Sequence, residues 1–128
     1  MIYGIGTDIC EIHRFERWLK KPEMFLRFFN AEEQPAFSDT VPSGTVCRHY
    51  AARFAAKEAF SKALGTGLTG FSLKDFYVAK DEMGKPFFVF GEETEKILEE
   101  RTGKNSKVHL SLSHEKDYAL AFVVIESE

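Results

Sequence analysis

The stretch RFAAKEAFSKALGTG, residues 53–67, carries the strongest helical pattern in the chain. On a helix with 3.6 residues per turn, its side chains divide into a small apolar half and a polar half. The apolar half contains Ala55, Ala56, Ala59, Phe60 and Ala63. The polar half contains Arg53, Lys57, Glu58, Ser61 and Lys62. We therefore predict a rigid helix from about Val46 to Leu64, with Gly65 as its C-cap, that packs closely on one side and holds charge on the other.

The polar half of this helix has two interpretations. Glu58 and Lys62 lie four residues apart, so they can form a solvated surface pair that contributes about 0.2 to 0.5 kcal/mol. Alternatively, this dense set of cations around one acid can bind a polyanionic ligand together with a metal ion. The helix taken alone favours the solvated pair, and a second metal ligand is needed to favour the other interpretation.

Composition limits the class of protein. The 128 residues predict one domain, residues 1–128, and the net charge of -3 argues against a general nucleic-acid binder. Two cysteines without CxxC spacing predict no disulfide framework and favour the reducing cytoplasm. Neither an export signal nor a membrane-spanning run is evident, and 13 phenylalanines leave apolar material for a subunit interface.

The amino-terminal residues 2–8 alternate like a strand, with Gly4, Gly6 and Asp8 on one face. Such an open face, ending in a carboxylate, suits the close approach of a ligand or a metal ion. A second interpretation makes Asp8 the N-cap of a following helix, in a capping-box pattern with Glu11. One carboxylate can serve both purposes through different oxygens, and the sequence leaves both open.

A helix from about Ile9 to Lys20 is predicted next, ended by Pro22. It would carry a stripe of basic side chains and one aromatic, namely Arg14, Arg17, Trp18 and Lys21. This stripe is either a docking face for an acidic partner helix or an ordinary solvated face. Asn30 is a candidate cap for a short helix that Pro35 restricts to about one turn, and residues 38–45 read as a loop.

Two hairpins and a helix complete the prediction. The first hairpin pairs residues 73–80 with 86–90, and a helix follows over 91–102. The last hairpin pairs residues 108–113 with 118–125. The order β-α-α-β-β-α-β-β predicts an α+β fold in which an antiparallel sheet packs on the long central helix.

Several kinds of chemistry are disfavoured by the spacing of the polar residues. Ser113 and His114 are adjacent on a strand and face opposite sides, which argues against a serine nucleophile. The histidines and cysteines lack paired zinc spacing. The glycines of residues 65–67 follow a helix C-terminus, where backbone binding of phosphate is unfavourable. Oxygen ligation by Asp8 and Glu58 instead fits Mg²⁺ and phosphoryl transfer.

Four segments together resemble one family: GIGTDICEI at 4–12, residues 53–67, GKP at 84–86 and LSLSHEKDYALAFVV at 110–124. They are similar to the holo-acyl-carrier-protein synthase type of 4′-phosphopantetheinyl transferase, over nearly the whole chain. The resemblance implies an enzyme of fatty acid biosynthesis with the 4′-phosphopantetheinyl transferase fold. It would move 4′-phosphopantetheine from coenzyme A to a serine of apo acyl carrier protein, with Mg²⁺, and release adenosine 3′,5′-bisphosphate. It also implies a homotrimer whose active sites lie between subunits.

The resemblance also implies roles for individual residues. Asp8 and Glu58 would hold Mg²⁺, and Lys62 would join them in catalysis. The residues expected to bind coenzyme A are Arg53, Lys57, Ser61, Lys62, Gly65, Thr66, Pro86, His109 and His114. The residues expected to bind the carrier protein are Arg14, Arg17, Lys21 and Arg27.

Two positions depart from the family pattern, Ala52 in place of glycine and Pro35 in a short helix that is usually uninterrupted. The general base for the carrier serine stays open between Glu58, a metal-bound water and another water. Two other classes of protein stay open beside the enzyme. One is a noncatalytic trimeric module that binds coenzyme A or nucleotide, and the other is a purely structural α+β protein.

Overall fold

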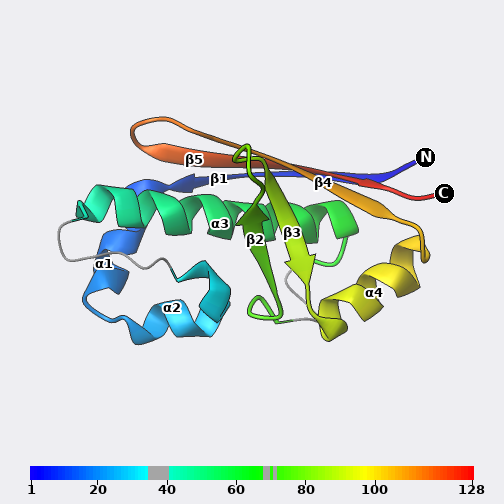
Figure 1. Ribbon diagram of the computed structural model, residues 1–128, viewed down its shortest axis with the longest axis horizontal. Helices are drawn as coiled ribbons and strands as arrows, with labels where there is room; N and C mark the ends of the chain where they lie inside the picture. The colour runs from blue at the N-terminus through cyan, green and yellow to red at the C-terminus, as the bar shows by residue number, and fades with distance from the viewer. Residues whose placement is uncertain (35–40, 68–69, 71) are drawn as a thin grey trace.

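A long helix runs through the middle of the computed structural model, which describes residues 1–34, 41–67, 70 and 72–128 (Figure 1). This helix is α3 (Ser43–Leu64), and it contacts strands of both sheets as well as the short helix that follows the first strand. A three-stranded antiparallel sheet covers one side in the order β1-β5-β4. Its strands are β1 (Ile2–Glu11), β4 (Lys107–His114) and β5 (Tyr118–Glu126).

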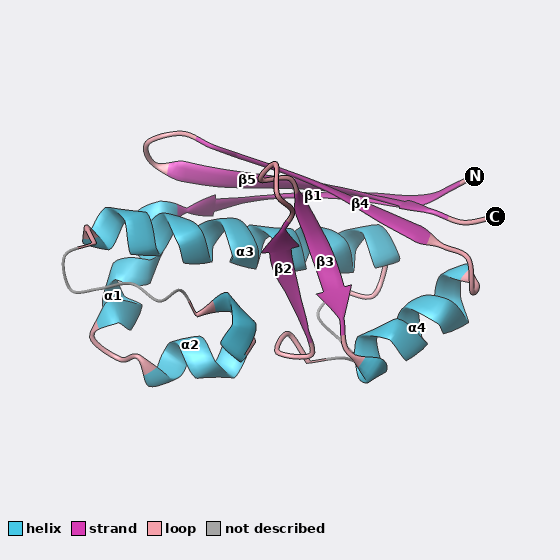
Figure 2. Cartoon of the chain, viewed as in Figure 1, coloured by secondary structure: helices cyan, strands magenta, loops and turns pink. Residues whose placement is uncertain are grey.

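A two-stranded hairpin crosses α3 on another side (Figure 2). It is formed by β2 (Phe76–Lys80) and β3 (Pro86–Phe90), and it leads into α4 (Glu92–Thr102). The remaining short helices are η1 (Ile12–Phe15), α1 (Glu16–Leu19), α2 (Glu23–Phe28) and η2 (Ala31–Glu33). They pack below the first half of α3 through aromatic contacts, such as the stacking of Phe25 on Tyr50 with ring centroids 4.1 Å apart.

Strand β1 lies very close to α3 because both elements use small residues at their contact. A Cβ atom on Gly4 would overlap the backbone oxygen of Ala63, and one on Gly6 would overlap that of Ala59. The prediction that the glycine face of β1 stands open for a ligand is therefore wrong. The helix backbone fills that face, and this close contact brings the strand that carries Asp8 against the helix that carries Glu58.

The two faces of the three-stranded sheet differ in chemistry. Alternate residues of β5 point to α3 and are fully buried, namely Ala119, Ala121, Val123 and Ile125. The opposite face exposes large apolar side chains: Ile5 and Ile9 are each 62% exposed, Leu120 41% and Phe122 44%. Cross-strand pairing brings these rows together, with Ile9 opposite Leu120. The outward face of the sheet is thus an apolar surface.

The predicted α+β fold, with antiparallel strands around a long central helix, is confirmed. Both hairpins and the helix over 91–102 are present, and α3 begins somewhat earlier than predicted. Gly65 ends α3 in the left-handed conformation, with φ of 88°. Asn30 caps η2 through a complete capping box with Glu33. Pro35 and the start of the loop predicted over 38–45 lie outside the described residues.

The helix predicted from Ile9 to Lys20 is wrong over its first three residues. Strand β1 continues through Ile9, Cys10 and Glu11, because these residues pair with the first three residues of β5. Helical turns begin only at Ile12. The interpretation of Asp8 as an N-cap is wrong for the same reason, since Asp8 lies within β1 opposite Ala121.

Candidate active site

Asp8, Glu58 and Lys62 come together where β1 meets α3. The ammonium of Lys62 donates to the backbone oxygen of Thr7 at 3.0 Å and to Asp8 Oδ1 at 3.3 Å. The Asp8 side chain is only 19% exposed, whereas that of Lys62 is 53% exposed. The carboxylate is therefore held in a recess, and the lysine reaches over it from the solvent side.

The carboxyl of Glu58 lies in an environment that disfavours its charge. Partial burial raises the pKa of Glu58, and the negative charge of Asp8 raises it further. The cations of Lys62 and Arg14 oppose this rise in pKa without cancelling it. Two neighbouring carboxylates, one of them destabilised as an anion, form a pair that a bound cation would stabilise.

Their chemistry fits Mg²⁺ better than a metal held entirely by protein. In the described part of the chain, no three His, Cys, Asp or Glu side chains are grouped as a metal site. Mg²⁺ is commonly bound through one or two carboxylates and completes its octahedron with waters and substrate phosphates. Asp8 and Glu58 supply two hard oxygen ligands of that kind, so the residues present fit this ion.

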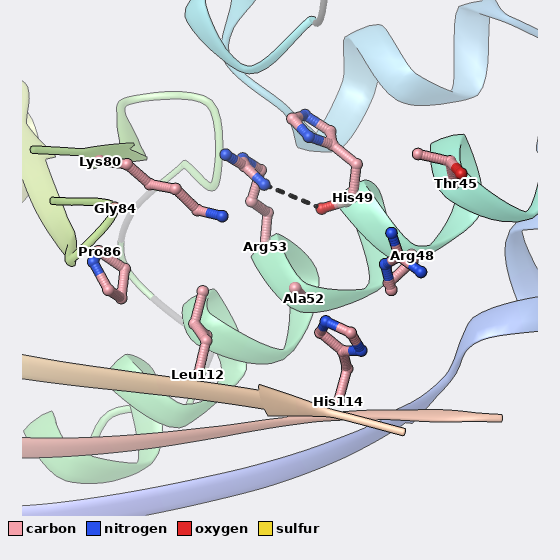
Figure 3. Close-up of a pocket in the computed structure, with 10 residues that line it drawn as sticks. All are labelled: Thr45, Arg48, His49, Ala52, Arg53, Lys80, Gly84, Pro86, Leu112 and His114. Carbon is pink, nitrogen blue, oxygen red and sulfur yellow. Dashed lines mark hydrogen bonds between the residues drawn. The ribbon is translucent and has the colours of Figure 1, made fainter. Parts of the chain in front are cut away.

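A second functional feature is a basic cleft of about 450 Å³ between α3, the β2-β3 hairpin and β4 (Figure 3). Arg48 and Arg53 come from α3, Lys80 from the end of β2 and His114 from the end of β4. Its other lining residues are Thr45, His49, Ala52, Gly84, Pro86 and Leu112. None of these ten lining residues is acidic, so the cleft is suited to an anion.

Arg53 is held in the cleft by one end of its guanidinium. Its Nη1 donates to the backbone oxygen of His49 at 3.3 Å, while its buried Nε has no hydrogen-bond partner among the described residues. Burial lowers the pKa of Arg53, and the negative charge of Glu33 partly restores it. A partly exposed guanidinium with unused donor capacity is available to an anionic ligand.

His49 also lines the cleft, and its ring points away from the other lining side chains (Figure 3). Its Nε2 lies 2.7 Å from the backbone oxygen of Glu33, so in the neutral ring this nitrogen donates to the carbonyl. Burial, followed by the positive charges of Arg53 and Lys80, lowers the pKa of His49 to about 4 despite this hydrogen bond. The ring is therefore neutral at physiological pH and is held by this hydrogen bond.

The two features lie on opposite edges of one sheet. Asp8 belongs to β1 and His114 to β4, and β5 separates these two strands. The lining of the basic cleft accordingly includes neither of the paired carboxylates nor Lys62. A single chain thus presents a pair of carboxylates on one side and a basic cleft on the other.

Comparison with known proteins identifies the family. A model described as the 4′-phosphopantetheinyl transferase superfamily matches residues 4–123. The chain belongs to this superfamily. The transferase is 46% identical to the holo-[acyl-carrier-protein] synthase of Treponema denticola, over 98% of this chain and 99% of that relative. It is 45% identical to the synthase of Vibrio parahaemolyticus, over 98% of each chain.

Solved structures agree with the sequence relatives. A holo-(acyl-carrier-protein) synthase from Bacillus anthracis, in complex with CoA (3′,5′-ADP), is 37% identical to the transferase. The two superimpose with a TM-score of 0.79 over 100% of this chain and 99% of that one. The synthase of Neisseria meningitidis is 41% identical, with a TM-score of 0.80 over 99% and 100% of the two chains. The predicted resemblance and fold are confirmed, and the transferase is an enzyme of this family.

Two predicted ligand-binding residues lie inside the transferase instead of on its surface. Lys57 has no exposed side-chain area, and Ser61 is 1% exposed. Ser61 donates to the backbone oxygen of Glu58 at 2.7 Å. The prediction that both residues belong to an exposed polar face of α3 is wrong, because residues 28–33 and β2 cover that side of the helix. Their roles in coenzyme binding stay predictions, now for two buried side chains.

The other predicted coenzyme residues are divided between locations. Pro86 and His114 line the basic cleft with Arg53, as does Ala52, the position that departs from the family pattern. Gly65 and Thr66 follow the C-terminus of α3, where Thr66 donates to the backbone oxygen of Gly67 at 2.8 Å. His109 lies on the outward face of the sheet, where it pairs with Glu126.

The predicted carrier-binding residues gather on one side of the molecule. Arg14, Arg17 and Lys21 line a surface cavity of about 520 Å³ with Trp18, Lys20 and Met24. The guanidinium of Arg27 is 4.0 Å from the sulfur of Met24, which extends this basic surface to α2. Arg14 also lies near the carboxylate site, which the sequence did not indicate. Its guanidinium lies 4.9 Å from the ring centroid of Phe54, close enough to Glu58 to act on its pKa.

Sequence reasoning missed Arg48, His49 and Lys80 as members of the cleft. The first two share one face of α3 with Ala52 and Arg53, at spacings of one helical turn, so a helical pattern extended toward the N-terminus could have found them. Lys80 lies opposite Pro86 in the first hairpin. That pairing places a cation beside GKP, but nothing local in the sequence brings the hairpin to α3.

In the described part of the chain, α3 and the shorter helices include none that is long and apolar enough to cross a membrane. Cys10 and Cys47 are both free and buried.

Proposed function

We propose that this transferase moves 4′-phosphopantetheine from coenzyme A to a serine of an apo acyl carrier protein in a Mg²⁺-dependent reaction that releases adenosine 3′,5′-bisphosphate. The observation that carries the proposal is the carboxylate pair of Asp8 and Glu58 with Lys62 placed over it. The names of the relatives support it, as does the CoA (3′,5′-ADP) in the related Bacillus anthracis structure.

In the reaction, a bond forms between the serine oxygen and the phosphorus bearing pantetheine. The bond from that phosphorus to the oxygen bridging the diphosphate breaks. Bound at Asp8 and Glu58, Mg²⁺ would neutralise charge on the diphosphate. Lys62 holds its ammonium between Thr7 and Asp8, where it can stabilise negative charge on the transferred group. The serine proton passes to Glu58 or to water.

We infer that the coenzyme lies between two subunits of a homotrimer. Coenzyme A carries anionic phosphates at both ends of its nucleotide part, and the basic cleft offers Arg48, Arg53 and Lys80 to such groups. The cleft and the carboxylate pair lie on opposite edges of the sheet, so one coenzyme can contact both if they come from neighbouring chains. The apolar outward face of the sheet provides the surface for that association.

The remaining expected coenzyme contacts belong to the same proposal. His114 and Pro86 would act from the cleft of one subunit. Gly65 and Thr66 would act from the α3 end of the subunit that supplies Glu58. His109, on the outward face, would lie at the boundary between chains.

The carrier protein is proposed to dock on the basic surface formed by Arg14, Arg17, Lys21 and Arg27. The family resemblance implies that the carrier protein is acidic, so these cations would attract it. The cavity beside Trp18 would receive an apolar side chain of the carrier. Arg14 links this surface to the carboxylate site through its effect on Glu58. A cytoplasmic location is proposed with these partners, and two buried free cysteines agree with a reducing compartment.

The test is to incubate the protein with coenzyme A, Mg²⁺ and apo carrier protein, and to measure the mass of the carrier. A gain equal to one phosphopantetheine is expected with the natural sequence, and none with Glu58→Gln, which keeps the size of the side chain and removes its charge. Binding of coenzyme A without any mass gain in the natural protein would favour the noncatalytic module. Absence of both would leave only a structural role.

A further inference from the structure

The interior contains a charged pair that the proposed reaction does not use. Lys57 Nζ lies 2.6 Å from Glu33 Oε1, and neither side chain is exposed. The same ammonium donates to the backbone oxygens of Leu73 at 2.6 Å and Phe28 at 3.2 Å. Desolvating two charges costs free energy that apolar side chains of equal volume would not cost. The charges of such a pair contribute little net stability, so a role in positioning neighbouring elements is considered.

Glu33 contacts the basic cleft through its backbone. Its carbonyl oxygen accepts the hydrogen bond from His49 Nε2 at 2.7 Å, and His49 is one of the residues that line the cleft. The placement of His49 therefore depends on where η2 is held. What holds η2 against α3 is the ion pair of Glu33 with Lys57.

The carboxylate of Glu33 also fixes β2, the strand that supplies Lys80. Its Oε2 accepts from the backbone nitrogen of Val78 at 3.2 Å, two residues before Lys80. Its Oε1 accepts from the backbone nitrogen of Asn30 at 3.1 Å as well as from Lys57. One buried side chain thus joins η2, α3 and the hairpin at the point where the cleft is assembled.

The charge of Glu33 supports the cleft electrostatically. It is the opposing charge that partly restores the pKa of the half-buried guanidinium of Arg53. Lys57 compensates for this negative charge within the interior and is flanked by the rings of Phe29 and Phe76, at 5.2 and 5.3 Å from their centroids. The pair as a whole adds no net charge to the core.

We propose that Glu33 is a positioning residue for the coenzyme, which sets His49, Arg53 and Lys80 at their places in the cleft before the ligand binds. The inference rests on the proposed function and adds a residue that never touches the coenzyme. Preorganised supporting contacts of this kind govern how tightly a site binds its ligand. Loss of Glu33 should therefore weaken coenzyme binding much more than it slows turnover of the bound complex.

A single substitution would leave one charge buried without its partner and could prevent folding. The test variant is therefore the double substitution Glu33→Leu with Lys57→Met, which replaces the pair by apolar side chains. A second variant, Glu33→Gln with Lys57→Met, retains an acceptor for Val78 but not the charge. The control is Leu98→Ala in α4, which lowers stability by removing core packing away from the cleft.

Each protein is assayed for KM of coenzyme A, for kcat with apo carrier protein, and for Kd of adenosine 3′,5′-bisphosphate by calorimetry. The apolar double variant should raise KM and Kd by about tenfold and change kcat by less than about threefold. The glutamine variant should lie between it and the natural protein, and Leu98→Ala should leave KM and Kd unchanged.

Unchanged KM and Kd in a folded apolar double variant would overturn the inference while leaving the proposed function intact. So would equal changes in Leu98→Ala, because the effect would then follow stability alone. If the natural protein neither binds the nucleotide nor modifies the carrier, the proposed function fails and the inference fails with it.

Discussion

His49 makes the stability of this fold depend on pH in a way that can be isolated by one substitution. In the folded chain, its pKa is lowered to about 4, whereas an exposed histidine has a pKa of about 6.5. The unfolded chain therefore binds a proton at this position below pH 6.5 that the folded chain rejects until about pH 4. Because the unfolded state binds more protons in this window, the free energy of unfolding must fall as the pH falls.

The size of the effect follows from the difference in pKa. Each pKa unit corresponds to about 1.4 kcal/mol, so a shift from about 6.5 to about 4 is worth about 3 kcal/mol. The ring of His49 is only partly buried, and solvent screening reduces the expected contribution to about 2 kcal/mol. The contribution of His49 to the free energy of unfolding should be fully present above pH 7 and lost near pH 4.

The variant that removes this proton equilibrium is His49→Gln, whose amide can still donate to the backbone oxygen of Glu33. Urea unfolding of both proteins, followed by the fluorescence of Trp18 at fixed protein concentration, gives their free energies of unfolding from pH 7 to pH 4. The natural protein should lose about 2 kcal/mol more than the variant over this range. His13→Gln, at an exposed position, is the matched control. Parallel curves for the natural protein and His49→Gln would refute the reasoning.

Three other predictions concern the carboxylate site and the sheet. Gly6→Ala should lower the free energy of unfolding by about 1 to 3 kcal/mol or more, because its Cβ would overlap the backbone of α3. Gly44→Ala, with open space around it, should not destabilise the fold, and thermal unfolding compares the two variants. Saturating Mg²⁺ should raise the melting temperature of the natural protein by about 4 °C, and a chelator should reverse this. Asp8→Asn with Glu58→Gln should abolish that rise, and a retained rise would remove these residues as ligands. Phe122→Glu, on the outward face, should convert a trimer to monomers in analytical ultracentrifugation, and an unchanged mass would place the interface elsewhere.

Features with a local physical cause were predictable from the sequence. Gly65 ends α3 because a residue without a side chain adopts the left-handed conformation readily, and this requirement is visible in the sequence alone. The turn before GKP and the capping box of Asn30 with Glu33 are of the same kind. The pairing of Asp8 with Glu58 was different. Their carboxylates suggested a shared Mg²⁺ site and the family resemblance agreed, but no local pattern in the sequence brings the two segments together.

The errors arose where distant segments decide the environment. Lys57 and Lys62 lie on one helix and look alike in sequence, yet one is fully buried and the other reaches solvent. The difference comes from residues 28–33 and from the segment entering β2, which cover Lys57 and supply its hydrogen bonds. Likewise, Ile9 extends a strand because it pairs with Leu120. That partner lies more than a hundred residues away along the chain. A helical wheel contains neither kind of information.

The close contact of Gly4 and Gly6 with α3 has a consequence for how the catalytic geometry can be altered. The separation of the two carboxylates is set by two main chains that touch, so no intervening side chain can be trimmed to bring them closer. An engineer who wished to bring the two carboxylates closer, for a smaller ion, would have to change the length of a side chain, because neither backbone can move inward. The spacing of Asp8 and Glu58 does not depend on side chains of the outer surfaces, so substitutions there should leave it unchanged.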